Sequence, residues 1–319
     1  MKLSAKTKLG LDELRMLILG ANILLGFQLR GAFTERFPEL TDAGRYLSAV
    51  SLGCLVCVVA LLIAPNPYHR IVEDGDDSGC FHRLVTVFAD AALLPFAIAL
   101  SLDVFPVIEL AWGTAAGIAA GTAAGGAALA AWYGGPLVAR HVTGQAQRRT
   151  TAMTSTGRRQ KTPIHTKIEQ SLTEARVIIP GAQALLGFQL SIILTHPFAE
   201  LPAIAQAVHA ACLGLIALSV ILLMAPAAYH RIVYEGEDCP EMYRIASTLI
   251  TLATVPLALG LAGDVYVVVA KIAGAGVGIA AGLGTVMLLL GLWYAYPFAT
   301  ACLMRRAALP KPGQAKTAA

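Results

Sequence analysis

Charged residues are scarce in this chain of 319 residues. Asp, Glu, Lys and Arg make up 14% of the sequence and apolar residues 56%, whereas an average soluble domain carries about 25% charged residues. So little charge excludes a disordered chain, and a net charge of +4 is too small to indicate a nucleic-acid partner. The mean hydropathy of +0.66 instead indicates a protein with several membrane-spanning helices.

Cysteine is also sparse and shows no framework. Six Cys in a chain of this size do not form a disulfide scaffold. Cys54 and Cys57 are separated by two residues inside an apolar run, where packing thiols are expected rather than a redox pair. We expect no metal site and no bound cofactor. We also find no nucleophile–base pair and no phosphate-binding loop in the sequence that would indicate an enzyme.

The most informative feature of the sequence is an internal duplication. Shifted by 161 positions, residues 11–136 align with residues 172–297 without a gap, and more than a third of the aligned residues are identical. This alignment predicts a first repeat over 1–139 and a second over 167–304. A basic linker over 140–166 joins them, and a flexible basic tail follows over 305–319.

Each repeat holds four apolar segments, and a spanning helix needs about 20 largely apolar residues. The segments are Leu14–Phe33, Tyr46–Ala64, Leu84–Leu102 and Val107–Tyr133, then Ala175–Thr195, Ala207–Ala225, Ile245–Leu261 and Val265–Tyr294. The sequence therefore predicts an all-α membrane protein with eight transmembrane helices. Because four is an even number, the two four-helix repeats should be parallel, related by a pseudo-two-fold axis along the membrane normal.

Basic residues cluster near the N-terminus, in the linker and near the C-terminus. All three clusters fall on one side of the expected bundle, and the positive-inside rule makes that side cytoplasmic. Both termini are therefore expected in the cytoplasm. The protein would meet the lipid bilayer along its spans and anionic lipids at the basic linker, and self-association is also left open.

Glycines recur every four residues in the fourth segment of each repeat. They are Gly113, Gly117, Gly121 and Gly125, then Gly274, Gly278 and Gly282. Spacing of this kind places small residues on one helix face, where another backbone can approach closely. We expect a helix-packing surface, with a pore-lining or sliding surface as the alternative.

Several polar residues fall inside apolar segments. The first segment of each repeat contains two amides, Asn22 and Gln28, then Gln183 and Gln189, and the third segment of the first repeat contains Asp90. Polar groups at membrane depth are costly and often functional. These five residues are our candidates for a transport path, with Asp90 as its main titrating group, although the amides could simply join helices. Asp103 and Asp264 mark the outer ends of the third segments, where a capping or interfacial role is expected.

A second repeated motif ends the second segment of each repeat. It reads Tyr68, His69, Arg70 in the first repeat and Tyr229, His230, Arg231 in the second, with acidic residues behind it. A collar of ion pairs at the cytoplasmic surface is one interpretation. The other is that the two histidines titrate near neutral pH and gate or relay protons.

The Gly-Phe-Gln-Leu blocks at 26–29 and 187–190 and the Ala-Pro-x-x-Tyr-His-Arg-Ile-Val blocks at 64–72 and 225–233 carry a resemblance. They resemble those of an uncharacterised family of bacterial four-span membrane proteins, here as a tandem duplication. Members of that family are sometimes named automatically as sodium:proton antiporters. The resemblance implies a bacterial inner-membrane location and gives no residue a role.

Two functions of different kinds follow from these features. The first is ion- or proton-linked transport, channel or antiporter-like, through the duplicated bundle. The second is a non-transporting scaffold or regulator that docks a partner or lipids at its Tyr-His-Arg-Ile-Val turns. A hydrated cavity at the polar residues would favour transport, and a dry bundle would favour the scaffold.

Overall fold

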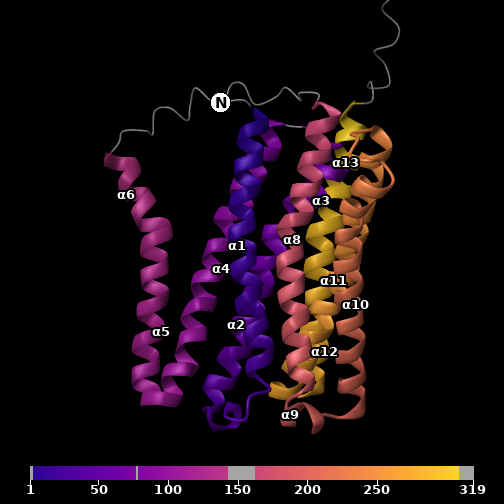
Figure 1. Cartoon of the computed structure of the whole chain (residues 1–319). Coiled ribbons are helices and arrows are strands. Elements are labelled where there is room, and N and C mark those ends of the chain that lie inside the picture. The colour runs from indigo at the N-terminus through magenta and orange to yellow at the C-terminus, as the bar shows by residue number, and fades with distance from the viewer. Residues whose placement is uncertain (1–2, 77, 143–161, 309–319) are drawn as a thin grey trace, which may run out of the picture.

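A computed structural model describes residues 3–76, 78–142 and 162–308, and these residues contain helices and no strand (Figure 1). The first repeat contains α1 (Leu3–Gly31), α2 (Asp42–Ile63), α3 (Pro65–Ile71), α4 (Gly79–Trp112), α5 (Thr114–Leu129) and α6 (Gly135–Val142). The second contains α8 (Ile164–Ile193), α10 (Ala203–Ile232), α11 (Pro240–Ala273), α12 (Ala275–Leu290) and α13 (Tyr296–Ala308). Short helical turns connect them: η1 (Phe37–Glu39), η2 (Ala130–Gly134), α9 (His196–Ala199) and η5 (Gly291–Ala295). The expected linker and tail lie largely outside the described residues.

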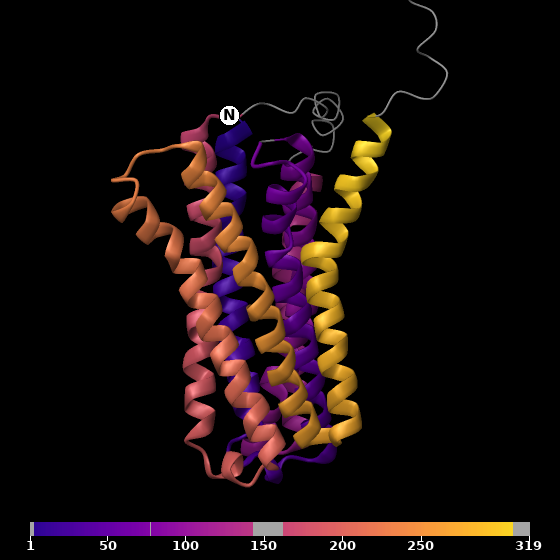
Figure 2. The same ribbon diagram turned by 90° about the vertical axis from the view of Figure 1, so that its right-hand side faces the viewer.

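The long helices stand side by side as one bundle (Figures 1 and 2). We call the end where α1 and α8 begin the linker end, and the other end the opposite end. Seven helices within the described residues are long and apolar enough to cross a membrane, which makes this a helical membrane protein. They are α2 continued by α3, α4, α5 continued by α6, α8, α10, α11, and α12 continued by α13. The more polar α1 is not among the seven.

We call the four long helical segments of each repeat its first, second, third and fourth arms. The Tyr-His-Arg-Ile-Val motif forms the last helical turns of the second arm in both repeats. In the first repeat Pro65 and Pro67 each lack an amide donor, and a separate helix, α3, begins there. In the second repeat Pro226 stands alone, and α10 continues through it to Ile232. Both arms end in the same tight turn, because Asp74 and Glu235 occupy matching positions with φ of 51° and 50°.

Glycine ends the third arm in both repeats. Gly113 and Gly274 adopt φ of 88° and 89°, a conformation that L side chains rarely accept, and the fourth arm starts at the next residue. The third segment therefore extends well beyond Leu102, where the sequence placed its end, and the fourth starts after Val107. Pro106 lies inside α4 without ending it.

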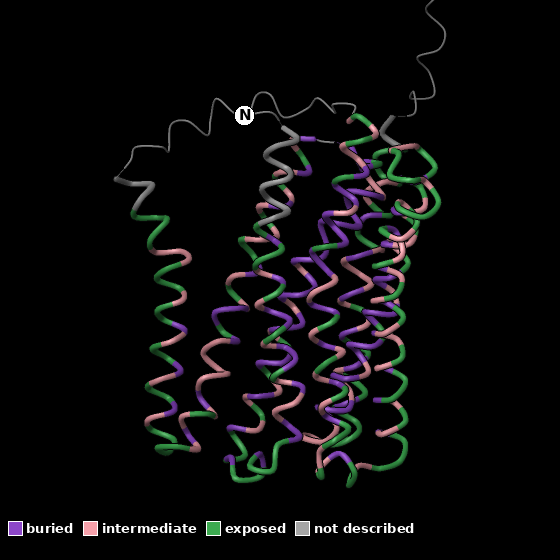
Figure 3. Tube along the Cα trace, in the orientation of Figure 1, coloured by how far each residue is buried: buried purple, intermediate pink, exposed green. Residues whose placement is uncertain are grey.

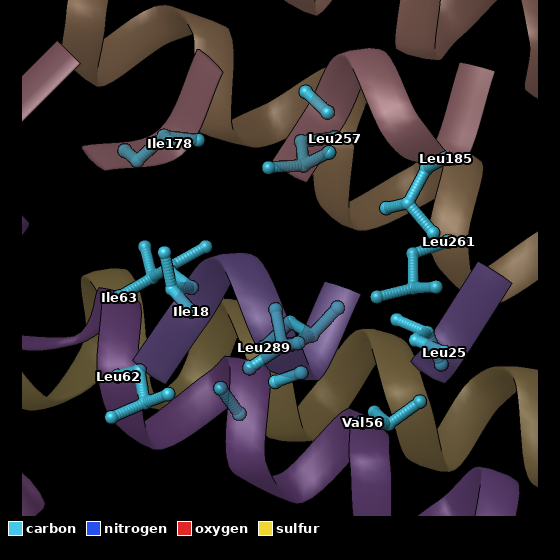
Figure 4. Close-up of a cluster of buried hydrophobic side chains, with 14 of the residues drawn as sticks. Ile18, Leu25, Val56, Leu62, Ile63, Ile178, Leu185, Leu257, Leu261 and Leu289 are labelled. Carbon is cyan, nitrogen blue, oxygen red and sulfur yellow. The ribbon is translucent and has the colours of Figure 1, made fainter. Parts of the chain in front are cut away.

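The apolar core lies where the repeats meet. Leucine, isoleucine and valine side chains from α1, α2, α8, α11 and α12 converge there (Figure 4). Gly26 lets α1 and α8 approach closely, since a Cβ atom at this position would lie 2.0 Å from the ring of Phe188. Burial is greatest along α2 and α11 and small along α5 (Figure 3).

Contacts between the repeats are not matched. Repeat 2 places α11, α12, η5 and α13 against α2 and α3 of repeat 1. The corresponding helices of repeat 1, α5 and α6, stand apart at one edge of the molecule, and α10 lies at the other edge (Figure 1). The two repeats thus share an element order while their surroundings differ.

Candidate functional site

An amide–carboxylate pair lies inside each repeat toward the opposite end. In repeat 1, Asp103 of α4 accepts hydrogen bonds from Gln28 of α1 and Ser51 of α2. Asp103 lies nine residues before the end of α4 at Trp112, about 14 Å along the helix axis. Its second carboxylate oxygen, Oδ2, is shielded from solvent and has no hydrogen-bond partner among the described residues.

A cavity of about 390 Å³ adjoins the first pair. Gln28 and Asp103 contribute its polar groups together with Ser48 and Thr34, and Phe27 contributes to an otherwise largely apolar wall. The carboxylate of repeat 1 therefore borders a hollow that reaches the outer surface, because the exposed side chains of Phe27 and Val107 also line it.

The pair in repeat 2 is more deeply buried and includes a histidine. Gln189 of α8 donates to Asp264 of α11, and both residues are buried. His209 of α10 places Nδ1 3.1 Å from Asp264 Oδ1 and Nε2 3.2 Å from the carbonyl oxygen of Gln189. In repeat 1 the positions of His209 and Cys212 are held by Ser48 and Ser51, so the two sites are not chemically equal.

The two contacts of His209 have a consequence for the protons of the second pair. A carbonyl oxygen only accepts, so Nε2 of His209 carries a proton. An ionised carboxylate also only accepts, so a further proton must lie either on Nδ1 of His209 or on Asp264. When both contacts are made as hydrogen bonds, the His209–Asp264 pair holds one proton more than a neutral imidazole beside a carboxylate.

A second buried polar cluster joins the repeats at the linker end. His69 of α3 places Nδ1 2.8 Å from Glu174 Oε1 of α8, and its ring stacks on Phe81 with centroids 4.2 Å apart. Arg70 forms an ion pair with the other oxygen of Glu174 and donates from Nε to Thr251 Oγ1 of α11 at 3.0 Å. The first Tyr-His-Arg motif is thus an internal contact between repeats.

The second copy of this motif faces outward. Arg231 and Tyr229 are exposed, and Tyr229 has 43% of its surface accessible, whereas Tyr68 has 2%. His230 lies half-buried, with Nε2 3.4 Å from Asp238. Tyr68 instead stacks on Tyr296 of α13 with ring centroids 5.8 Å apart. The two motifs therefore have different surroundings.

The five residues predicted to line one path lie in separate places. Gln28 and Gln189 belong to the two amide–carboxylate pairs, and Asn22 donates to the carbonyl of Ile18 in its own helix at 3.0 Å. Gln183 is exposed, with Met224 Sδ at 4.0 Å. Asp90 is exposed on α4, and its backbone carbonyl accepts a hydrogen bond from the Tyr133 hydroxyl.

The glycines of the fourth arm divide into two kinds. Gly117, Gly121 and Gly125 are buried against α4, and a Cβ atom at Gly121 would lie 2.7 Å from the carbonyl oxygen of Ser101. In repeat 2, Gly278 and Gly282 are buried against α11 in the same way. A Cβ atom at Gly113 or Gly274 would have no neighbour within 4 Å, and these two glycines instead form the turns.

The residues predicted from the sequence to form a transport path did not include Asp103, Asp264, His209 or Glu174. A usable signal was present, because Asp103 and Asp264 recur in register with Gln28 and Gln189, 75 residues apart in each repeat. His209 carried no such signal, since its counterpart is Ser48. The described residues contain no group of three or more His, Cys, Asp or Glu that could hold a metal ion.

Comparison with known sequences places both repeats in one family. Residues 7–136 and 160–297 each match DUF6328, a family of unknown function. Because the two matches cover most of the sequence, the chain belongs to this family and carries two copies of its domain. No curated protein and no solved structure matches the chain.

Proposed function

We propose that this protein moves protons across the membrane in which its helices lie. The observation that carries the proposal is the His209–Asp264–Gln189 cluster, which places a buried imidazole against a buried carboxylate inside the bundle. Ionisable residues within membrane helices are costly, so they often mark proton or ion pathways. A purely structural contact could be made by neutral side chains.

A second set of titratable groups lies toward the other end of the bundle. Glu174 and Gln189 belong to the same helix, α8, and are separated by 15 residues, about 22 Å along its axis. This distance covers most of the roughly 30 Å hydrocarbon layer. His69 and Glu174 at the linker end and His209 and Asp264 toward the opposite end are suitable terminal sites for a proton pathway.

The space between these sites is packed with apolar side chains. Ile178 and Leu185 of α8 face Leu257 and Leu261 of α11 (Figure 4). A continuous water path is therefore not part of this conformation, and proton passage would need the helices to shift. The cavity beside Asp103 offers the first repeat a route toward the opposite end.

We also propose how the bundle is oriented in the membrane. Basic residues near the N-terminus, in the linker and near the C-terminus would place the linker end in the cytoplasm of a bacterial inner membrane. The linker would then lie near anionic lipid headgroups. Protons would pass between the cytoplasm and the opposite side.

The alternative is a scaffold that docks a partner through its Tyr-His-Arg-Ile-Val turns. The burial of His69 and Arg70 leaves only the second turn accessible for such docking. Transport accounts for the buried His209–Asp264 pair and for the cavity beside Gln28 and Asp103 as well, and we therefore favour it.

Proton flux into proteoliposomes tests the proposal. Vesicles with a trapped pH-sensitive dye would receive a potassium diffusion potential, and acidification would be followed with time. Asp264→Asn keeps the shape of the side chain and removes its charge, so flux should fall to that of protein-free vesicles. Asp42→Asn, at the exposed start of α2, is the matched control and should keep the wild-type rate.

Two results would overturn the proposal: no flux above empty vesicles for the wild type, or an unchanged rate in Asp264→Asn. Asp90→Asn distinguishes the path proposed here from one centred on Asp90. Because Asp90 is exposed, the Asp90→Asn variant should keep the wild-type proton flux.

A further inference from the structure

The inner geometry of the two repeats is matched even though their surroundings differ. The Tyr133 hydroxyl donates to the carbonyl of Asp90 in repeat 1, and the Tyr294 hydroxyl donates to the carbonyl of Thr251 in repeat 2. These four residues occupy equivalent positions, 161 apart. The third and fourth arms of each repeat therefore pair in the same register.

In repeat 2 the third and fourth arms diverge toward the linker end, and helices of repeat 1 lie between them. Figure 2 shows α11 and α13 separating with repeat 1 behind and between them, and α3 packs on η5 and α13. Trp293 of η5 is fully buried there and donates from Nε1 to the carbonyl of Ala60 at 3.0 Å. We call this filled region the intrachain interface.

Ion pairing completes the intrachain interface. Arg70 enters from α3 of repeat 1 and contacts Glu174 and Thr251, which both belong to repeat 2. These contacts of Arg70 run from the end of the second arm of repeat 1 to the first and third arms of repeat 2, and Trp293 adds a contact from the fourth arm.

Within the described residues, the equivalent surfaces on the other side of each repeat are not filled. In repeat 1, α4 and the α5–α6 arm diverge toward the linker end, and α5 packs chiefly on α4 (Figure 1). In repeat 2, the end of α10 with Arg231 is exposed. The two surfaces lie at opposite edges of the molecule (Figure 1), so one chain does not bring them together.

These two open surfaces carry complementary charge at equivalent positions. The counterparts of Glu174 and Thr251 are Glu13 and Asp90, and both are exposed. Arg231, the counterpart of Arg70, would therefore meet two carboxylates where Arg70 meets one. Asp90 lies 11 residues into α4, about 16 Å along it, where contact with lipid would be costly.

We propose that a second copy of this chain fills the open interface. The end of α10 of one chain lies between α4 and the α5–α6 arm of the other, and Arg231 pairs with Glu13 and Asp90 of that other chain. The exchange is reciprocal, because each chain has one edge of each kind. Two head-to-tail contacts then close a four-repeat dimer with two-fold symmetry.

Cross-linking between two differently tagged copies tests the proposal without any transport readout. Both copies lack the six natural cysteines; one carries Arg231→Cys and the other Asp90→Cys. Oxidation in the membrane should give a two-chain product that bears both tags. Arg70→Cys with Thr251→Cys in one chain is the matched control, and should cross-link within that chain. Asp42→Cys replaces Asp90→Cys as the collision control and should give no two-chain product.

Charge exchange provides a second, independent measurement. Arg231→Glu and Asp90→Arg should each lower the dimer fraction, determined by light scattering in detergent, by about tenfold or more, because like charges then meet. The double variant should recover part of it, because the exchanged charges attract each other while Glu13 still repels the glutamate introduced at position 231. A monomeric wild type, no two-chain product from the Arg231→Cys and Asp90→Cys copies, or dimers that persist in both single variants would overturn the proposal.

Discussion

His69 and Glu174 are 105 residues apart in the sequence, yet His69 Nδ1 lies 2.8 Å from Glu174 Oε1 in the interior of the bundle. The same carboxylate is ion-paired with Arg70, and the side chains of all three residues are almost completely inaccessible. Glu174 is therefore the residue through which repeat 2 holds the Tyr-His-Arg motif of repeat 1.

Replacing Glu174 should strongly destabilise the protein. Glu174→Gln removes the negative charge and leaves Arg70 buried without its counter-ion, and breaking a buried ion pair costs about 3–5 kcal/mol. Thermal and denaturant unfolding in detergent would measure the loss. Glu241→Gln, on the exposed start of α11, is the control and should change stability by less than about 0.5 kcal/mol. Equal stability of both variants would contradict the assigned role of Glu174.

Gln189 should contribute more to the stability of the protein than Gln183, an exposed amide on the same helix. Gln189→Leu removes the donor to buried Asp264, and a buried polar group left short of a partner costs about 1–3 kcal/mol. Gln183→Leu changes an exposed residue of α8, so its stability should stay equal or rise. Chemical unfolding in detergent compares the two. The reverse order would show that Gln189 is dispensable.

The helical arms could be predicted from the sequence because each depends on local signals. Apolar segments of spanning length, the doubled Pro65 and Pro67, and the glycines that end the third arms act within a few residues of chain. The end of the third arm was placed too early, because Asp103 and Pro106 resemble the end of an apolar segment. Membrane helices tolerate proline where neighbouring helices and local adjustments satisfy the freed backbone groups, and Asp103 obtains hydrogen bonds from Gln28 and Ser51.

The contacts between the repeats could not be predicted in the same way. Glu13 and Glu174 stand at equivalent positions, as do Arg70 and Arg231, so the sequence offers two equal sets of partners. Tertiary packing buries one set and leaves the other exposed. Asp90, whose counterpart is Thr251, lies on the surface of a single chain. Asp264, whose counterpart is Asp103, lies inside.

Glycines of the fourth arms should tolerate bulk only where space exists. A Cβ atom at Gly278 would lie 2.6 Å from Ala270 Cβ, and one at Gly117 would lie 3.0 Å from the carbonyl oxygen of Phe105. Gly278→Leu and Gly117→Leu should therefore force helices apart and cost about 1–3 kcal/mol each. A Cβ at Gly284 or Gly126 would have no neighbour within 4 Å.

Gly284→Leu and Gly126→Leu are accordingly the matched controls on the same two helices. They should keep or slightly raise the melting temperature, since Leu favours a helix more than Gly. Equal melting of the tight and the open positions would show that the glycine stripe does not bring helices together.

We expect α1 to be the eighth spanning helix. Its 29 residues reach about 44 Å, enough to cross the hydrocarbon layer. Its polarity is compensated within the bundle, because Asn22 donates to Ile18 and Gln28 donates to Asp103. α1 also packs along α8, and its core residues are as buried as those of the seven apolar helices.

Reporter fusions test this expectation by the side on which each reporter is active. Fusions at the N-terminus and at Gly144 should both report the cytoplasm, and a fusion at Asp42 should report the outside. The fusion at Gly144 serves as the reference for the linker side. If the N-terminal fusion and the fusion at Asp42 report the same side, α1 does not span and the bundle has seven crossings. If Gly144 and the C-terminus report opposite sides, the parallel arrangement of the repeats is wrong, because an even number of crossings must separate them.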